Sequence, residues 1–176
     1  MTHFIEGKRI YLRAVELSDV TDAYVRWMND PNINRYMETW HFPHTRANIE
    51  QYVKDHTDNR NEPFFAIFKK EFMGSHIGNI KLGPINWIHR YADISLFMGE
   101  KDLWGQGYAT EAINLVTEYA FKKLNLHKVK SGIYYDNKGS LRAFQKAGFK
   151  IEATLPKHVW FNGDYQDIWL VGRINE

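Results

Sequence analysis

The clearest hydrophobic pattern in the chain lies between residues 91 and 124. Residues 92–98 alternate between apolar and polar types and are rich in β-formers, which predicts a strand. A loop containing Gly105 and Gly107 follows. Apolar side chains then recur at helical spacing, which predicts a helix with one buried face: Ala109, Ala112, Ile113, Val116, Ala120 and Leu124. The order is therefore strand, glycine loop, helix.

The same criteria predict the elements on either side of this unit. Before it, we expect strands at 8–14, 63–68 and 76–82, and helices from Ser18 or Asp19 to about 28, from Pro31 to 37 and from Thr45 to about 58. After it, we expect strands at 128–134, 150–155 and 165–171, and a helix at 140–147. Asn162-Gly163 is a strong hairpin turn, whereas 38–44 and 83–89 are expected to be loops.

This alternation of strands and helices, without a repeat or linker, predicts one domain over residues 1–176. The fold class is α+β (mixed α/β), with helices on the faces of a sheet. A chain of 176 residues is long enough to bury a core of its own.

Composition excludes several classes of function. With no cysteine, the chain has no disulfide, thiolate nucleophile or thiolate metal site, which fits a reducing compartment. The net charge is +2 and the sequence has no run of like charges, so we expect no surface that binds nucleic acid. An apolar run of about 18 residues and an apolar N-terminal signal region are both missing, so we expect no membrane partner and a cytoplasmic location. Eight histidines include no His-Glu-x-x-His motif, and we expect no metal.

The glycine loop carries the first candidate chemistry. Its glycines permit close approach to the backbone, and the following helix presents unpaired N–H groups at its positive end, which together suit a phosphate or pyrophosphate. The spacing is not that of a Walker loop, and the third glycine of the dinucleotide fingerprint is missing. Taken alone, Gly105 and Gly107 favour a simple tight turn.

Two motifs together resemble the GNAT superfamily of acyl-CoA-dependent N-acyltransferases. Residues 104–109 are similar to its Gln/Arg-x-x-Gly-x-Gly/Ala cofactor loop, although Trp104 stands where Gln or Arg is usual. Residues 137–149 resemble its Asn-x-x-Ser/Ala…Tyr-x-x-x-Gly-Phe segment, with Phe144 in the tyrosine position. With a tryptophan at this position, the motif resembles that of the branch that contains ribosomal-protein, spermidine and amino-sugar acetyltransferases.

The resemblance implies a mostly antiparallel twisted sheet, splayed between its fourth and fifth strands, with helices on both faces. It also implies acetyl-CoA as cofactor, with the pyrophosphate on the backbone amides of Gln106–Thr110 and pantetheine along Leu96–Met98. For the Thr110 hydroxyl, an ordinary role in the first helical turn is equally compatible. The implied cofactor-binding residues are Leu96, Phe97, Met98, Trp104, Gly105, Gln106, Gly107, Tyr108, Ala109, Thr110, Asn137, Ser140 and Phe144.

Transfer to an amine requires a route for the amine's proton. Asp93, at the start of the fourth strand, is the first candidate base; alternatively it is a solvated edge charge or pairs with Arg90. Glu38 lies among aromatic residues and is a candidate for holding the acceptor's cation.

The acid that protonates the leaving thiolate is less clear, because Phe144 cannot donate a proton. Ser140 resembles a serine that some family members place near the CoA sulfur, so it is the candidate acid, although its position also suits a helix N-cap. Tyr134 and Tyr135 are alternative donors. Asn137 is expected to order pantetheine and the turn.

The acceptor groove is expected to contain Tyr36, Glu38, Trp40, Trp87 and Trp160. The run 27–38 resembles members that acetylate nucleotide-linked amino sugars, so this acceptor ranks first for an enzyme that acetylates a primary amine. A protein N terminus ranks second and a polyamine third. Phe144 also leaves a non-catalytic acyl-CoA sensor as an alternative. The chain is expected to be a monomer or homodimer.

Overall fold

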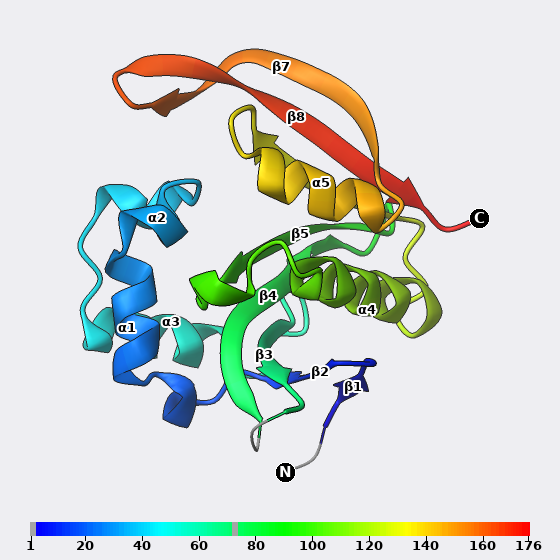
Figure 1. Cartoon of the computed structure of the whole chain (residues 1–176). Helices are drawn as coiled ribbons and strands as arrows, with labels where there is room; N and C mark the ends of the chain where they lie inside the picture. Colours follow the sequence, from blue (N-terminus) through cyan, green and yellow to red (C-terminus); the bar gives the residue numbers. More distant parts are fainter. Residues whose placement is uncertain (1–2, 72–73) are drawn as a thin grey trace.

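A computed structural model describes residues 3–71 and 74–176, which form one domain around a single sheet (Figure 1). Over these residues the sheet has eight strands in the order β1-β2-β3-β4-β5-β6-β8-β7. The strands are β1 (Ile5–Glu6), β2 (Ile10–Ala14), β3 (Phe64–Lys69), β4 (Ser75–Asn86), β5 (Tyr91–Met98), β6 (Lys128–Tyr134), β7 (Lys150–Phe161) and β8 (Asp164–Ile174).

The helices gather in two groups (Figure 1). One group is α1 (Asp22–Asn29), α2 (Pro31–Asn34) and α3 (Arg46–His56), and the other is α4 (Tyr108–Lys122) and α5 (Lys138–Lys146). Short 3-10 turns lie at Leu17–Asp19, Glu38–His41 and Lys101–Leu103.

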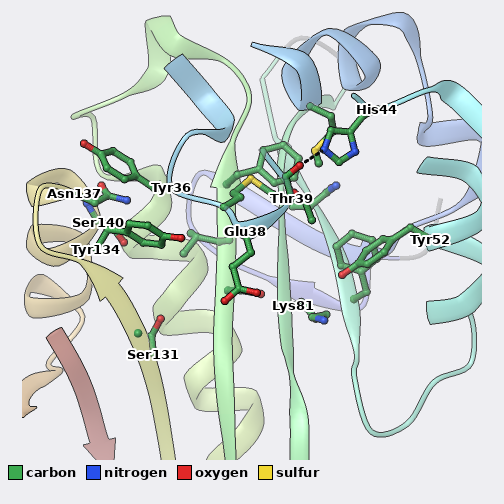
Figure 2. Close-up of a pocket in the computed structure, with 18 of the residues that line it drawn as sticks. Tyr36, Glu38, Thr39, His44, Tyr52, Lys81, Ser131, Tyr134, Asn137 and Ser140 are labelled. Carbon is green, nitrogen blue, oxygen red and sulfur yellow. Dashed lines mark hydrogen bonds between the residues drawn. The ribbon is translucent and has the colours of Figure 1, made fainter. Parts of the chain in front are cut away.

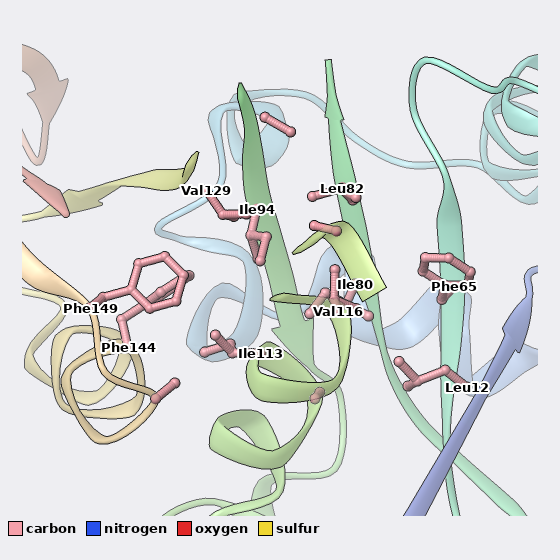
Figure 3. Close-up of a cluster of buried hydrophobic side chains, with 14 of the residues drawn as sticks. Leu12, Phe65, Ile80, Leu82, Ile94, Ile113, Val116, Val129, Phe144 and Phe149 are labelled. Carbon is pink, nitrogen blue, oxygen red and sulfur yellow. The ribbon is translucent and has the colours of Figure 1, made fainter. Parts of the chain in front are cut away.

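Both faces of the sheet are buried, as the resemblance implies. Along β2, Ile10 and Leu12 join the core under α4, while Tyr11 between them joins the core under α1 and α3. This alternation follows from the two-residue period of a strand. Figure 3 shows the α4 side, where Ile113 and Val116 pack on Ile80 and Ile94.

β5 and β6 are the fourth and fifth of the strands predicted from the sequence, and the structure confirms that they splay. Among the described strands they form the one parallel pair, joined from Tyr91–Lys128 to Asp93–Lys130. β5 nevertheless continues to Met98 and β6 to Tyr134, so the strands diverge beyond the paired residues. At the point of divergence, the Ser131 hydroxyl donates to the Ile94 carbonyl at 2.8 Å.

Several boundaries differ from those predicted; α2, for example, ends at Asn34 rather than at 37. β4 continues through Gly83-Pro84, predicted as loop, because a bulge after Leu82 lets pairing resume between Ile85 and Ala92. The first helix begins after Thr21, whose hydroxyl accepts from the Tyr24 amide. Asp19, one of its two predicted caps, is buried and pairs instead with Arg13 at 2.6 Å.

The β7–β8 hairpin is also longer than predicted, since its strands meet at Phe161 and Asp164 around the expected Asn162-Gly163 turn. Its far end lies beyond α5 and toward α2 (Figure 1).

The N-cap of α5 is Asn137, so the alternative role of Ser140 as that cap is wrong. The Asn137 side-chain oxygen accepts from the Ser140 amide at 3.1 Å, and Ser140 lies in the first turn.

We therefore expect Asn137→Ala to lower the free energy of unfolding by about 1 kcal/mol, the usual effect of removing an N-cap. Ser140→Ala is the matched control, because it leaves that hydrogen bond in place. Urea unfolding of both variants measures the difference. An equal loss in the two would contradict the assignment of the cap.

Candidate active site

A cavity of ≈ 670 Å³ opens where β5 and β6 diverge (Figure 2). One wall consists of Ser95–Phe97 of β5, Ser131–Tyr134 of β6, and residues of α5. The other wall is formed by α1, the 36–44 segment, α3 and β4. The cavity thus begins where β5 and β6 diverge and extends between the two groups of helices.

The first wall contains several of the predicted cofactor residues. Leu96, Phe97, Asn137, Ser140 and Phe144 all line the cavity. Because β5 has parted from β6 there, backbone groups of residues 94–98 that face β6 are left without a ladder partner. Such groups suit the amides of a pantetheine arm, so the geometry fits the cofactor that the resemblance implies.

The glycine loop lies at the N terminus of α4. Gly107 is its N-cap with φ +86°, and the first intrahelical bond runs from the Glu111 amide to the Gly107 carbonyl at 3.0 Å. The amides of Tyr108, Ala109 and Thr110 precede that bond and remain available to an anion. The Gln106 amide, also predicted to bind pyrophosphate, makes a 3.4 Å turn contact to Leu103. Gly105 has φ +76° with open space around its missing side chain.

Trp104, the departure from the family motif, closes the end of β5. Its indole N–H donates to the Met98 carbonyl at 2.9 Å, and 44% of the residue stays exposed. Trp104 and Met98 thus lie at the loop, outside the lining of the cavity.

Arg9 fixes the loop from the start of β2, a role that sequence reasoning missed. Its guanidinium donates to the Gln106 carbonyl at 2.8 Å, pairs with Glu111 at 3.0 Å and lies over the Tyr108 ring. Burial raises the pKa of Glu111, but hydrogen bonds from the Arg9 amide and side chain outweigh it and hold that pKa below its usual value. No local motif marks an arginine that lies 97 residues before its partner.

The second wall presents an acidic side chain. Glu38, in the 3-10 turn, extends into the cavity below Tyr36 and beside Tyr134 (Figure 2). Within the described ranges, Glu38 takes part in no ion pair. Burial, with a contribution from the Glu38 charge, raises the pKa of Tyr134.

The remaining sequence candidates lie outside the cavity lining. Asp93 pairs with Lys130 at 3.3 Å across the last step of parallel pairing, rather than with Arg90. Trp40 packs on Phe161 behind Tyr36, Trp87 donates to Asn61 at 2.7 Å, and Trp160 packs edge-on against Tyr165. Conversely, Asn79 and Lys81 of β4 line the cavity and were not predicted, because a lone polar residue in a strand carries no signal.

Two further properties hold for residues 3–71 and 74–176. In these ranges no three His, Asp or Glu side chains are grouped so that they could hold a metal ion. No helix within them is both long and apolar enough to cross a membrane.

Comparison with known proteins gives one family. The profile of the acetyltransferase (GNAT) domain matches residues 9–150. A spermidine N(1)-acetyltransferase of Vibrio cholerae is 28% identical, over 92% of this chain and 91% of the relative. The probable N-acetyltransferase YjcK of Bacillus subtilis is 29% identical, over 97% of each chain.

The fold has solved counterparts as well. A spermidine N-acetyltransferase of Vibrio cholerae, crystallised with CoA and spermine, superposes with a TM-score of 0.84 at 27% identity, covering 96% of this chain and 97% of the other. Its CoA agrees with the cofactor expected from the motifs.

We expect Gly107→Val to weaken CoA binding at least about tenfold, because its side chain would stand beside the free amides of the loop. The added Cβ would also lie 3.3 Å from Arg9. The control is Gly163→Val, which imposes the same positive φ (+87°) in the distant hairpin, where nothing lies within 4 Å. Calorimetric titration with CoA, with thermal unfolding alongside, separates binding from backbone strain. Equal CoA affinity in the two folded variants would place the anion site elsewhere.

Proposed function

The chain belongs to the acetyltransferase (GNAT) family and is an acetyl-CoA-dependent N-acetyltransferase; we propose that its acceptor is a small molecule whose primary amine is held by Glu38. The observation that carries this proposal is the position of Glu38, an acidic side chain in the cavity without a cationic partner among the described residues. A carboxylate in this environment attracts an ammonium group.

The surrounding side chains support the same assignment. Tyr36, Phe42 and Tyr52 line the cavity and provide apolar contact for the body of an acceptor. The amine would then lie between Glu38 and the diverging strands, next to the reactive end of the cofactor.

Glu38 also offers a path for the first proton. An aliphatic ammonium has a pKa near that of lysine, about 10, so it must lose a proton before it can attack. Acetyl-CoA supplies the acetyl group as a thioester: a C–N bond forms as the C–S bond breaks. The Glu38 carboxylate accepts the first proton of the ammonium and passes it to solvent, and it accepts the second as the C–N bond forms. An N–H of the Leu96–Met98 segment stabilises the developing oxyanion.

Tyr134 is our candidate for returning a proton to the leaving thiolate. Phe144 is only 1% exposed and packs against Phe149, so it holds the tyrosine position of the motif as a core residue. Tyr134 lines the cavity from β6, and because its pKa is raised, its phenol stays protonated throughout the neutral range. Ser140, the candidate acid from the sequence, lines the same cavity from α5.

The acceptor ranked first from the sequence, a nucleotide-linked amino sugar, loses its main support. In the run that suggested it, Asn29 ties down the 36–44 segment through two hydrogen bonds with His44, of 2.8 and 3.0 Å. Asp30 caps α2 and pairs with Lys101 at 2.8 Å. These residues position the wall of the cavity and leave no specific argument for a sugar.

A polyamine is the second candidate, favoured by relatives that are named spermidine acetyltransferases. Glu38 is the one acidic residue in the described lining, however, and Lys81 lies in the same cavity. These charges suit an acceptor with one ammonium group better than spermine.

We therefore expect the enzyme to acetylate amines with one ammonium group in preference to spermine. Thiol release from acetyl-CoA, measured with monoamines, spermidine, spermine, amino sugars and a free peptide N terminus, tests the proposal. Tight CoA binding without release by any amine would instead support a non-catalytic sensor.

We expect Glu38→Gln to reduce kcat/KM for the amine by about 10²-fold, within the range for loss of a proton-accepting group, while KM for acetyl-CoA changes little. Asp93→Asn, which alters the base suggested by the sequence, should keep kcat/KM within about threefold because Asp93 faces Lys130. A larger loss of kcat/KM in Asp93→Asn than in Glu38→Gln would make Asp93 the base.

We expect Tyr134→Phe to lower kcat by about tenfold, a modest effect because a thiolate is a tolerable leaving group near neutral pH. The loss should grow as the pH falls below the pKa of a free thiol, about 8.5, where the thiol form predominates. Ser140→Ala, measured in parallel, should have a smaller effect. A larger loss in Ser140→Ala, with unchanged unfolding, would make Ser140 the donor.

A further inference from the structure

Two polar residues of β4 face the cavity and are not used by the proposed mechanism. Asn79 and Lys81 are two positions apart, so their side chains project from the same face of the strand, and both line the cavity. Figure 2 shows Lys81 and Glu38 extending into the cavity from different elements, β4 and the 38–41 turn.

Lys81 remains cationic there. Burial lowers the pKa of Lys81, but the nearby Tyr52 and Glu62 side chains outweigh burial and raise it above its usual value. Its ammonium nitrogen lies 3.3 Å from a Glu62 oxygen, and only 18% of its side chain is exposed.

Glu62, the partner of Lys81, also lies close to a histidine. The Nε2 atom of His56 lies 3.3 Å from the second Glu62 oxygen, and Nδ1 lies 2.8 Å from the Tyr52 carbonyl. An ammonium group has three N–H donors, so the contact with Glu62 leaves Lys81 donors for a ligand in the cavity that it lines.

Asn79 adds an unsatisfied donor. The Gly78 carbonyl accepts from His76 Nε2 at 3.1 Å, so that nitrogen carries the hydrogen, and Asn79 Oδ1 faces it at 2.7 Å. This contact fixes the amide with Nδ2 outward from His76. The residue is 1% exposed, and Nδ2 makes no well-formed hydrogen bond within the described chain. The Tyr24 hydroxyl lies near it, since the Asn79 side chain offsets part of the rise that burial causes in the pKa of Tyr24. A buried amide donor without a full hydrogen bond is unfavourable, and a ligand oxygen in the cavity would complete it.

We propose that the acceptor is a zwitterion of the amino-acid type, whose carboxylate is bound by Lys81 and Asn79 while its ammonium is held by Glu38. This inference rests on the proposed function and specifies the class of its substrate. The cavity offers charges of both signs, which a zwitterion complements. A polyamine would instead place a positive charge near Lys81.

The donor set suits a carboxylate. One ammonium group and one amide N–H match the charge and the acceptor oxygens of a monoanion. A phosphate monoester, with nearly two charges, would leave much of its charge unpaired in a largely apolar cavity.

Matched substrate pairs test the carboxylate directly: leucine with isopentylamine, and phenylalanine with phenethylamine. Each pair differs only in the carboxylate. For each pair, kcat/KM for the amino acid is divided by kcat/KM for the amine. We expect this ratio to fall at least about tenfold in Lys81→Met, mainly through a higher KM for the amino acid. Comparing the ratio between enzymes cancels the different basicity of the two amines. Lys81→Arg, which keeps the charge, should retain most of the preference, and the exposed Lys54→Met is the control.

Binding provides a readout independent of turnover. With CoA present, N-acetyl-leucine should bind Lys81→Met at least about tenfold more weakly than the parent enzyme, whereas N-isopentylacetamide should bind both equally. An unchanged ratio or unchanged binding of N-acetyl-leucine overturns the carboxylate site. If no amine of any class is acetylated, the proposed function fails, and the titration alone decides whether Lys81 binds a carboxylate.

Discussion

The structure depends on a parallel strand pair that is kept short. β5 and β6 are joined over three residue pairs and then part, although both strands continue. Backbone groups beyond Asp93 and Lys130 cannot all find a partner across the sheet, and a buried unpaired peptide group is unfavourable. The Ser131 hydroxyl satisfies the Ile94 carbonyl at the branch point. Farther along, the unpaired groups line the gap and suit a ligand with amide groups of its own, as the pantetheine arm of CoA has.

The elements around the divergence hold both ends of that ligand's site. α4 packs its apolar face on the sheet, and the loop before it is tied to the end of β5 through Trp104 and Met98. Arg9 and Glu111 bind the N-terminal end of α4 to β2, a strand two places away from β4 in the sheet. On the other side, Asn29 holds the 36–44 segment in place, so that Glu38 lies in the cavity. The predicted cofactor loop and the wall that carries Glu38 are thus held by separate networks on one sheet.

Local signals in the sequence were sufficient for most of the fold and for the strand, glycine loop and helix that form the predicted cofactor site. In residues 91–124 the apolar positions first follow the period of a strand and then, after a glycine loop, the period of a helix. The structure forms a strand, a loop and a helix there. Boundaries were missed where tertiary contacts override local preference: Asp19 caps no α-helix because Arg13 binds it, and β4 passes Gly83-Pro84 because β5 lies alongside. The acceptor wall was only partly predictable. The sequence identified Glu38 as a candidate because it lies among aromatic residues. Lys81 and Asn79 become candidates only in the folded chain, where β4 faces α3 and the 36–44 segment across a cavity.

The most direct test of this account is a crystal structure of the protein with CoA. The account predicts the pantetheine arm between β5 and β6, hydrogen-bonded to the backbone of Leu96–Met98, with its sulfur facing the cavity that holds Glu38 and Tyr134. The pyrophosphate should lie on the amides of Tyr108, Ala109 and Thr110. CoA bound outside the divergence, or β5 and β6 found paired along their full length in the complex, would contradict it.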